Sequence, residues 1–357
     1  MREVTMRIIG GVAAMLIILA GCQTTATKSA NVHGATAARK RVLVIVNKWW
    51  ECDPLMEVLL NDNARPASYL GWPTQLNHPR KRPDQNNLPP EDPSPIPRAV
   101  FALTNISVEV WCISDLLEDL PDKPQFQSSS EVKARRLSKA FAGRPVDFVV
   151  AVGAAGYPGD ASENGSVVVG TKVFMHNCHP GGANSNSNWN VGPFDKIVPT
   201  TLDSNAFASI TMIETSANPS VKARFLVPPL NPAPTGRLLA DQDFVAIGEF
   251  NVTDYSEYDK TDQQTLDAYR SSNDPNLGKS LETTHGLIRA QSEAPFIFVS
   301  GIYDRVGHFE EEVSPRLYSQ KTTAAHNAGV VVAWMLPKID VMFGSMQNAS
   351  ATNENAK

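Results

Sequence analysis

The sequence predicts an α/β protein, and the segment Ser280–Asp304 is the clearest indication. Its apolar residues recur at helical spacing before a proline opens the run PFIFVSGI. A helix that leads directly into a buried strand is α/β construction. Glu282 stands where the helix is expected to begin, and Asp304 where the strand is expected to end. Since such sheets hold ligands at strand ends, we expect both carboxylates at one crevice.

The bulk composition bounds the class of protein. The 357 residues are 42% hydrophobic and 19% charged, enough for one large α/β domain or two smaller ones. The net charge of -5 and the absence of a basic block argue against a nucleic-acid partner. His176, Cys178 and His179 match no closed zinc pattern, and no dinucleotide or Walker loop is present. We therefore expect neither metal nor cofactor.

The N-terminus carries a targeting signal, which we assign to residues 1–21. Two arginines precede an apolar run that is too short to span a membrane. The run ends in LAGC, which resembles the lipobox of bacterial lipoproteins and implies a lipid on Cys22. Gln23 then favours the periplasmic side of the outer membrane in a Gram-negative envelope. An uncleaved anchor helix is the alternative. Residues 22–40, rich in Thr, Ala, Ser and Lys, are expected to form a flexible tether.

Apolar and β-branched runs mark the expected strands of a domain over residues 41–340. They are Arg41–Val46, Val108–Ile113, Val146–Gly153, Val167–Met175 and Phe244–Val252. The expected helices are Pro54–Leu60, Ser130–Ala142, Thr265–Ser271 and Ser314–Leu336, the last stopping near Pro337. Residues 61–98 form a Pro-rich insertion that could cover a site, and residues 341–357 are expected to be a disordered tail. In an oxidising compartment, Cys52, Cys112 and Cys178 could form one disulfide, whose pairing stays open.

The first expected strand is followed by a carboxylate, Glu51, beside two tryptophans. Apolar surroundings disfavour the charged form of a carboxylate and raise its pKa, which suits a group that activates water near neutral pH. The alternative is a helix N-terminal acid that the helix dipole favours. A second feature is the run Gly153–Gly156, whose small residues would let backbone N–H groups approach a ligand closely. Tight strand packing explains that run equally well.

Several segments, in order along the chain, resemble the nucleoside phosphorylase/nucleosidase superfamily. RVLVIV with the following Glu51 resembles the first strand and acid of the nucleosidases. VAVGAAG and NGSVVVGTKV resemble the strand-glycine segment and the next strand, and FVAIGEFNVTDY the strand before the base-binding segment. SLETTHGLI resembles the "MEaaal" helix, and IYD the "ISD" motif. The resemblance implies one three-layer α/β/α domain with a central mixed, partly barrel-like sheet.

The resemblance also implies roles for individual residues. Asp304 would donate a proton to the purine N7, Glu282 would hold ribose hydroxyls, and Glu51 would position or deprotonate the attacking water. Tyr255 would pack on the base. The remaining substrate contacts would come from Leu281, Ala154, Ala155 and Gly156.

Departures from the family pattern bear on the reaction. Ala151 and Ala154 stand where phosphorylases bring an arginine and a serine to phosphate, and burying an unpaired phosphate is costly. Thr171, Leu281 and Tyr303 replace the usual Asp, Met and Ser. We therefore expect hydrolysis of the N-glycosidic bond of purine nucleosides. Phosphorolysis and a non-catalytic nucleoside-binding lipoprotein are the alternatives, and a homo-oligomer is possible because the superfamily commonly forms one.

Overall fold

The computed structural model describes eleven stretches of the chain. They are residues 38–66, 71–75, 96–117, 130–178, 192–214, 221–228, 234, 236–251, 257–273, 277–312 and 319–354. The chain divides into units Met1–Ala37 and Ala38–Lys357, and every described residue belongs to the second. The expected signal peptide, Cys22, Tyr255 and most of the tether and Pro-rich insertion therefore lie outside the described residues.

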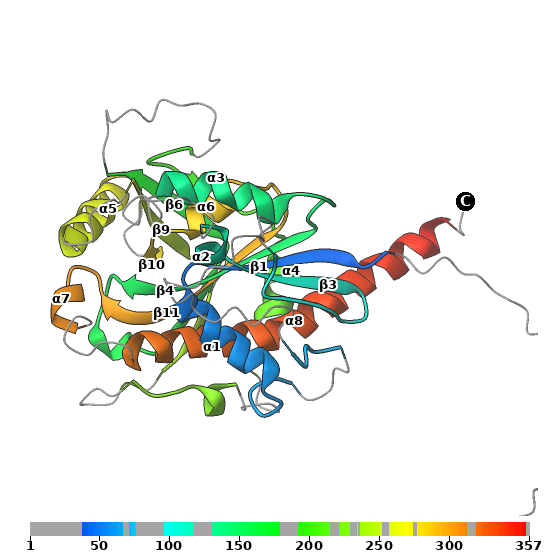
Figure 1. Cartoon of the computed structure of the whole chain (residues 1–357). Helices are drawn as coiled ribbons and strands as arrows, with labels where there is room; N and C mark the ends of the chain where they lie inside the picture. Colours follow the sequence, from blue (N-terminus) through cyan, green and yellow to red (C-terminus); the bar gives the residue numbers. More distant parts are fainter. Residues whose placement is uncertain are drawn as a thin grey trace, which may run out of the picture. The chain divides into compact units, whose positions relative to one another are not determined.

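Within those stretches, one mixed sheet of 11 strands forms the centre of the fold (Figure 1). The strands are β1 (Lys40–Val46), β2 (Ala99–Ala102), β3 (Ile106–Cys112), β4 (Phe148–Tyr157), β5 (Val167–Gly170), β6 (Lys172–Asn177), β7 (Ile197–Val198), β8 (Leu238–Ala240), β9 (Val245–Phe250), β10 (Gly278–Glu282) and β11 (Phe296–Arg305).

Strand β4 is the branch point of the sheet. The main path runs β2-β3-β1-β4-β10-β9-β6-β7, while β11 pairs with β4 and β5, and β5 with β8. β4 is parallel to β1 and to β11, and it meets β10 antiparallel where Leu281 faces Gly156. The C-terminal ends of β4 and β10 therefore approach each other. This mixed, branched sheet confirms the expected α/β class.

The helices cover both faces of the sheet. They are α1 (Trp49–Leu60), α2 (Ile113–Leu116), α3 (Ser130–Phe141), α4 (Ser204–Thr211), α5 (Tyr258–Ser272), α6 (His285–Arg289), α7 (Phe309–Glu312) and α8 (Ser319–Glu354), with 3-10 turns at Ala161–Glu163 and Lys222–Arg224. Figure 1 shows α1 and α8 on one side of β1 and β11, and α3 and α6 on the other.

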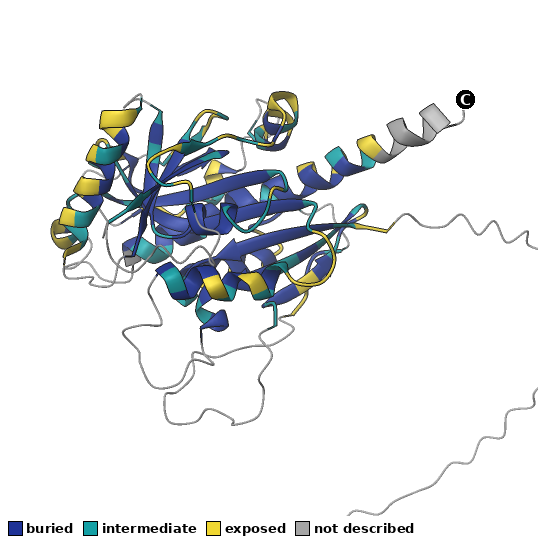
Figure 2. Cartoon of the chain, turned by 90° about the horizontal axis from the view of Figure 1, so that it is seen from above, coloured by how far each residue is buried: buried dark blue, intermediate teal, exposed yellow. Residues whose placement is uncertain are grey.

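Alternation along β1 separates two hydrophobic cores. Val42, Val44 and Val46 belong to the core that includes α1 and α8, whereas Leu43 and Ile45 belong to the core that includes α2, α3 and α6. Successive side chains of a strand point to opposite faces, so a strand buried on both faces is apolar throughout. Most strand residues are accordingly buried, and Figure 2 shows exposed residues mainly on helices and loops.

Three expected element boundaries differ from those observed. Glu282 is the last residue of β10, and α6 begins only at His285. The expected strand Val167–Met175 is two strands, because the chain changes pairing partners at Thr171, whose hydroxyl donates to the Gln242 carbonyl at 2.7 Å. α5 begins at Tyr258, seven residues before the predicted start.

The C-terminal helix also differs from the prediction. α8 continues through Pro337 to Glu354, so most of the expected disordered tail is helical. Proline costs about 3 kcal/mol inside a helix. Buried Leu336, Ile339 and Phe343 flank it and anchor both halves in the core. The stretch Gln320–Met346 is long and apolar enough to cross a membrane, but 56% of its most apolar window is buried within the fold.

Candidate active site

A cavity lies at the ends of the central strands and is rich in carboxyl groups and aromatic rings. Its lining consists of Asn47, Lys48, Trp50, Glu51, Ala154, Gly156, Glu249, Tyr258, Asp262, Leu281, Glu282, Thr283, Tyr303 and Phe309. Five of the residues selected from the sequence are among them, namely Glu51, Ala154, Gly156, Leu281 and Glu282. Asp304 and Ala155 are not in the lining.

Glu51 is fixed between α1 and β4. Its Oε2 atom accepts a hydrogen bond from the backbone N–H of Lys48 at 2.6 Å, which closes the first turn of α1. Its Oε1 atom accepts one from the backbone N–H of Ala154 at 2.8 Å. Burial raises the pKa of Glu51 to about 7, although these two N–H groups oppose the shift. Glu51 is thus both a helix N-terminal acid and a carboxyl poised to gain or lose a proton at neutral pH.

The Gly153–Gly156 run lies inside β4 and is not a loop. Ala154 and Gly156 face the cavity, whereas Ala155 points to the opposite face and packs in the core with α6. The expected approach of backbone N–H groups to a ligand is wrong for Ala154, because Glu51 already accepts its N–H. The backbone of β4 thus holds the Glu51 carboxyl in place.

Asp304 lies directly behind Gly156. A Cβ atom added to Gly156 would stand only 3.3 Å from its Oδ1 atom, so the glycine lets the carboxyl lie close to the backbone of a residue that lines the cavity. The side chain is 1% exposed, and neither oxygen has a hydrogen-bond partner in the part of the chain that the structure describes. Burial, followed by the charges of Asp262, Glu312 and Asp259, raises its pKa well above the ordinary range. Burial thus favours the protonated form of the Asp304 carboxyl.

Glu282 is held by the turn that follows it. Its carboxylate accepts hydrogen bonds from the backbone N–H of Thr284, from the Thr284 hydroxyl at 2.7 Å, and from the backbone N–H of His285. A carboxylate has about four lone pairs, so one remains for a hydroxyl group in the cavity. The buried imidazole of His285 lies 3.4 Å from Glu282 and 3.1 Å from the Ser300 hydroxyl. These contacts connect the turn after β10 to β11.

Three buried charged residues of the site were not identified from the sequence. Glu249 on β9 and Asp262 on α5 line the cavity, and Lys133 on α3 is 2% exposed with its Nζ atom 3.4 Å from the Thr283 hydroxyl. Burial lowers the pKa of Lys133 to about 7, against the charges of Glu282, Glu51 and Glu249. The sequence did carry a signal for Glu249, because an acidic residue within the apolar strand VAIGEF is unusual enough to indicate a functional role.

Aromatic rings form another wall. The Phe309 ring lies 5.2 Å from Tyr258 and 6.3 Å from Tyr303, and Tyr303 lies 6.3 Å from Trp50. The Lys321 ammonium lies 4.7 Å from the Phe309 ring centre and 5.5 Å from that of Trp50. Such a wall suits a flat, π-rich ligand.

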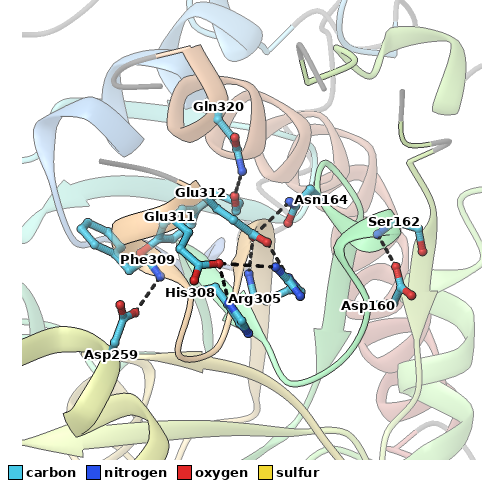
Figure 3. A network of polar contacts seen from close by, with 11 residues as sticks. Asp160, Ser162, Asn164, Asp259, Arg305, His308, Phe309, Glu311, Glu312 and Gln320 are labelled. Atoms are coloured by element: carbon cyan, nitrogen blue, oxygen red, sulfur yellow. Dashed lines mark hydrogen bonds and ion pairs between the residues drawn. The ribbon is translucent and has the colours of Figure 1, made fainter. Parts of the chain in front are cut away.

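Short helix α7, which carries Phe309, is tied to both neighbouring elements (Figure 3). Asp259 on α5 accepts hydrogen bonds from the backbone N–H of Phe309 at 2.6 Å and of Glu310 at 3.3 Å. On the other side, the backbone N–H of Arg305 donates to Glu312 at 2.9 Å, and the Arg305 guanidinium pairs with the same carboxylate. The Phe309 ring is thus fixed at the cavity.

The arrangement divides chemical tasks. One part of the cavity offers a carboxyl that can accept a proton from water, and a carboxylate that can accept hydroxyl hydrogen bonds. The buried carboxyls Asp304, Asp262 and Glu249 can donate protons. Among the described residues, no group of three His, Cys, Asp or Glu side chains could hold a metal ion.

No protein-family model and no curated protein matches the sequence. Similar solved structures include the methylthioadenosine/S-adenosylhomocysteine nucleosidase of Neisseria meningitidis, at 15% identity and a TM-score of 0.42, covering 83% of this chain and 98% of that one. The corresponding nucleosidase of S. pneumoniae has 11% identity and a TM-score of 0.44, covering 84% and 99%. Futalosine hydrolase of Helicobacter pylori has 10% identity and a TM-score of 0.43, covering 84% and 97%. At these identities we argue function from the cavity itself.

Proposed function

We propose that this protein hydrolyses the N-glycosidic bond of purine nucleosides. In the proposed reaction, Glu51 takes a proton from a water molecule that attacks the anomeric carbon. Glu282 accepts hydrogen bonds from ribose hydroxyls, and Asp304 donates a proton to the departing base. The bond to the base then breaks through an oxocarbenium-like state, as in glycoside cleavage.

The observation that carries the proposal is the position and protonation of Glu51. The carboxyl lines the same cavity as Glu282, is held by two backbone N–H groups, and has a pKa of about 7. General bases work best when their pKa lies near the working pH. A carboxyl with only a packing role would have no need of a place in the cavity wall.

The acid role of Asp304 is supported by its burial and by its position beside Gly156. Burial favours the protonated carboxyl, its oxygens have no hydrogen-bond partners among the described residues, and Gly156 places no side chain against it. After proton transfer, the Lys321 ammonium, whose charge already acts on Asp304, would stabilise the carboxylate. Purine acceptance is supported by the aromatic wall of Tyr258 and Phe309.

Hydrolysis is favoured over phosphorolysis by what surrounds Glu51. Ala151 is buried in the core, and the N–H of Ala154 is already used, so neither offers a donor to phosphate. The carboxyls Glu51 and Glu282 would repel that anion. A non-catalytic binding protein is the other alternative, against which the near-neutral pKa of Glu51 speaks.

A panel of purine nucleosides tests these three functions. The mature domain is incubated with each nucleoside, with and without phosphate, and free base is followed by chromatography. Base release that is independent of phosphate supports hydrolysis, whereas release that requires phosphate supports a phosphorylase. Nucleoside binding without release of base supports the binding protein.

We further propose that the protein is a lipoprotein of the bacterial cell envelope, anchored through Cys22. The support is the LAGC sequence after a short apolar run. Labelling with a radioactive fatty acid should mark the wild type and not Cys22→Ser. Equal labelling of both proteins would refute the anchor.

A further inference from the structure

Two carboxyls outside the proposed roles form a pair in the cavity wall. Glu249 is the next-to-last residue of β9 and is 1% exposed, while Asp262 lies on α5 and is 7% exposed. Both line the same cavity, and each carboxyl acts on the pKa of the other. Two buried carboxyls that interact in this way disfavour double ionisation, because like charges favour the protonated form. At least one of the two is therefore expected to keep its O–H group.

The pair also has unused bonding capacity. The Oε2 atom of Glu249 is buried and has no hydrogen-bond partner among the described residues, although Glu249 lines the cavity. An unpaired buried polar atom is costly, so it marks a place where a ligand group is expected. A carboxyl oxygen that carries a proton would donate to a ligand acceptor.

The charges around the pair favour its protonated form. Burial, then the charge of Asp262, raises the pKa of Glu249 well above its ordinary value, and burial raises the pKa of Asp262 to about 7. The negative charge of Glu282 also raises the pKa of Glu249, and that of Asp259 raises the pKa of Asp262, whereas the positive charge of Lys133 lowers the pKa of Glu249. Cys178 and Tyr303 also feel the pair, and burial raises the pKa of each.

The pair lies on the same side of the site as Asp304. Asp262 is the charge that acts most strongly on the Asp304 carboxyl, and Tyr258, one helical turn before Asp262, belongs to the aromatic wall. A purine placed between this wall and Gly156 would present several ring nitrogens as acceptors. One would meet Asp304, and another would meet the pair.

We propose that Glu249 and Asp262 together form a second acid, which donates a carboxyl hydrogen bond to a ring nitrogen of the departing base other than the one that Asp304 protonates. This inference rests on the proposed function. As the C1′–N bond breaks, its electron pair stays on the base, Asp304 transfers one proton, and the pair keeps its own proton while its hydrogen bond strengthens. Glu51 takes the proton from the attacking water.

The test compares two leaving groups. A purine needs acid assistance, whereas the p-nitrophenolate that leaves p-nitrophenyl β-D-ribofuranoside is stable as an anion and needs none. Asp262→Ala and Glu249→Ala, which remove the carboxyl without supplying an amide donor, should each lower kcat/KM for purine nucleosides roughly tenfold or more. Both variants should stay within about twofold of the wild type on the nitrophenyl riboside. Asp267→Asn, an exposed acid on the same helix, is the matched control and should change neither rate.

Each outcome of this comparison either supports or overturns the second acid. Equal losses on both substrates, or no loss on either, would overturn the second acid while leaving the hydrolase intact. A wild type that releases base from no nucleoside would end the proposed function, and this inference with it. If Asp262→Ala does not fold, Glu249→Ala carries the same comparison, because either substitution removes a carboxyl of the pair and leaves no donor in its place.

Discussion

The Oε1 atom of Glu51 accepts a hydrogen bond from the backbone N–H of Ala154 at 2.8 Å, which ties the first turn of α1 to β4. A side chain that is buried, held at both oxygens and open to the cavity has one orientation. Attack by water would then occur from a fixed direction.

Replacing this carboxyl should separate catalysis from binding. In Glu51→Gln, the amide cannot accept the proton of water, so we expect base release to fall by about 10²–10⁴-fold. Nucleoside affinity should stay within a few-fold, as measured by calorimetry. Glu57→Gln, an exposed position on the same helix, serves as the control and should keep full activity. A Glu51→Gln protein that releases base at the wild-type rate would remove Glu51 from the mechanism.

The raised pKa of Glu51 also predicts how stability depends on pH. The folded protein binds the proton up to about pH 7, whereas the unfolded chain releases it near pH 4.5. The contribution of Glu51 to folding is therefore greatest below pH 4.5 and is lost as pH rises through 7. Relative to the wild type, Glu51→Gln should gain ~3 kcal/mol in unfolding free energy between pH 4 and pH 8. Urea denaturation at both values measures it, and a pH-independent difference would contradict the shift.

Contact between the departing base and Asp304 should require a glycine at position 156. In Gly156→Ala, the new Cβ atom would stand 3.3 Å from the Asp304 Oδ1 atom and 3.3 Å from the Val306 Cγ2 atom. The methyl group should block contact between base and acid, so we expect at least a roughly tenfold loss of kcat on purine nucleosides. The nitrophenyl riboside should be affected less. Equal activity of the variant would place the acid elsewhere.

Glu282 should serve both substrate and fold. In Glu282→Gln, the amide NH₂ would face donors from Thr284 and His285, and an unmatched buried polar group costs about 1–3 kcal/mol. We therefore expect a lower thermal midpoint together with a higher KM. The wild type should prefer adenosine to 2′-deoxyadenosine, and the variant should lose this preference. An unchanged preference would mean that Glu282 does not contact the sugar hydroxyl.

The structure predicts which two cysteines would form a disulfide on oxidation. The buried thiol of Cys52 on α1 acts on the pKa of the buried Cys112 thiol on β3, which places the two side by side, while Cys178 contacts the Thr265 hydroxyl at 3.6 Å. Oxidised glutathione should accept two electrons and two protons from the first pair and join it. Peptide mass mapping after alkylation should find Cys178 modified and the other two linked. Alkylation of all three after oxidation would refute the pairing.

The sequence predicted the central strands and several site residues because these depend on local signals. Arg41–Val46 and Ser130–Ala142 were close to the observed β1 and α3, since apolar period decides such elements. Glu51 and Glu282 reach one cavity because each follows or ends a central strand.

Other features depend on contacts between distant residues. Asp262 was missed because α5 begins earlier than its apolar pattern suggests, and its importance comes from Glu249 across the fold. The position of Asp304 behind Gly156 follows from the register of β11 on β4, which no local pattern encodes. The path of α8 through Pro337 likewise depends on burial against the sheet.

The sharing of β4 among three partners limits how the site can deform. A strand with β1, β10 and β11 bonded to it has no free edge, so displacing it would break ladders on both sides at once. The part of the cavity that β4 forms is therefore stiff. Adjustment to ligands of different size would occur where α5 and α7 line the cavity. There, the Asp259 carboxylate on α5 accepts hydrogen bonds from two backbone N–H groups of α7, and Arg305 holds Glu312 at the other end of that short helix. A few polar contacts restrain α7, whereas strand ladders restrain β4 on both sides. Substitutions on α5 and α7 would then change the range of substrates, while β4 and the Glu51 carboxyl that it holds keep their positions.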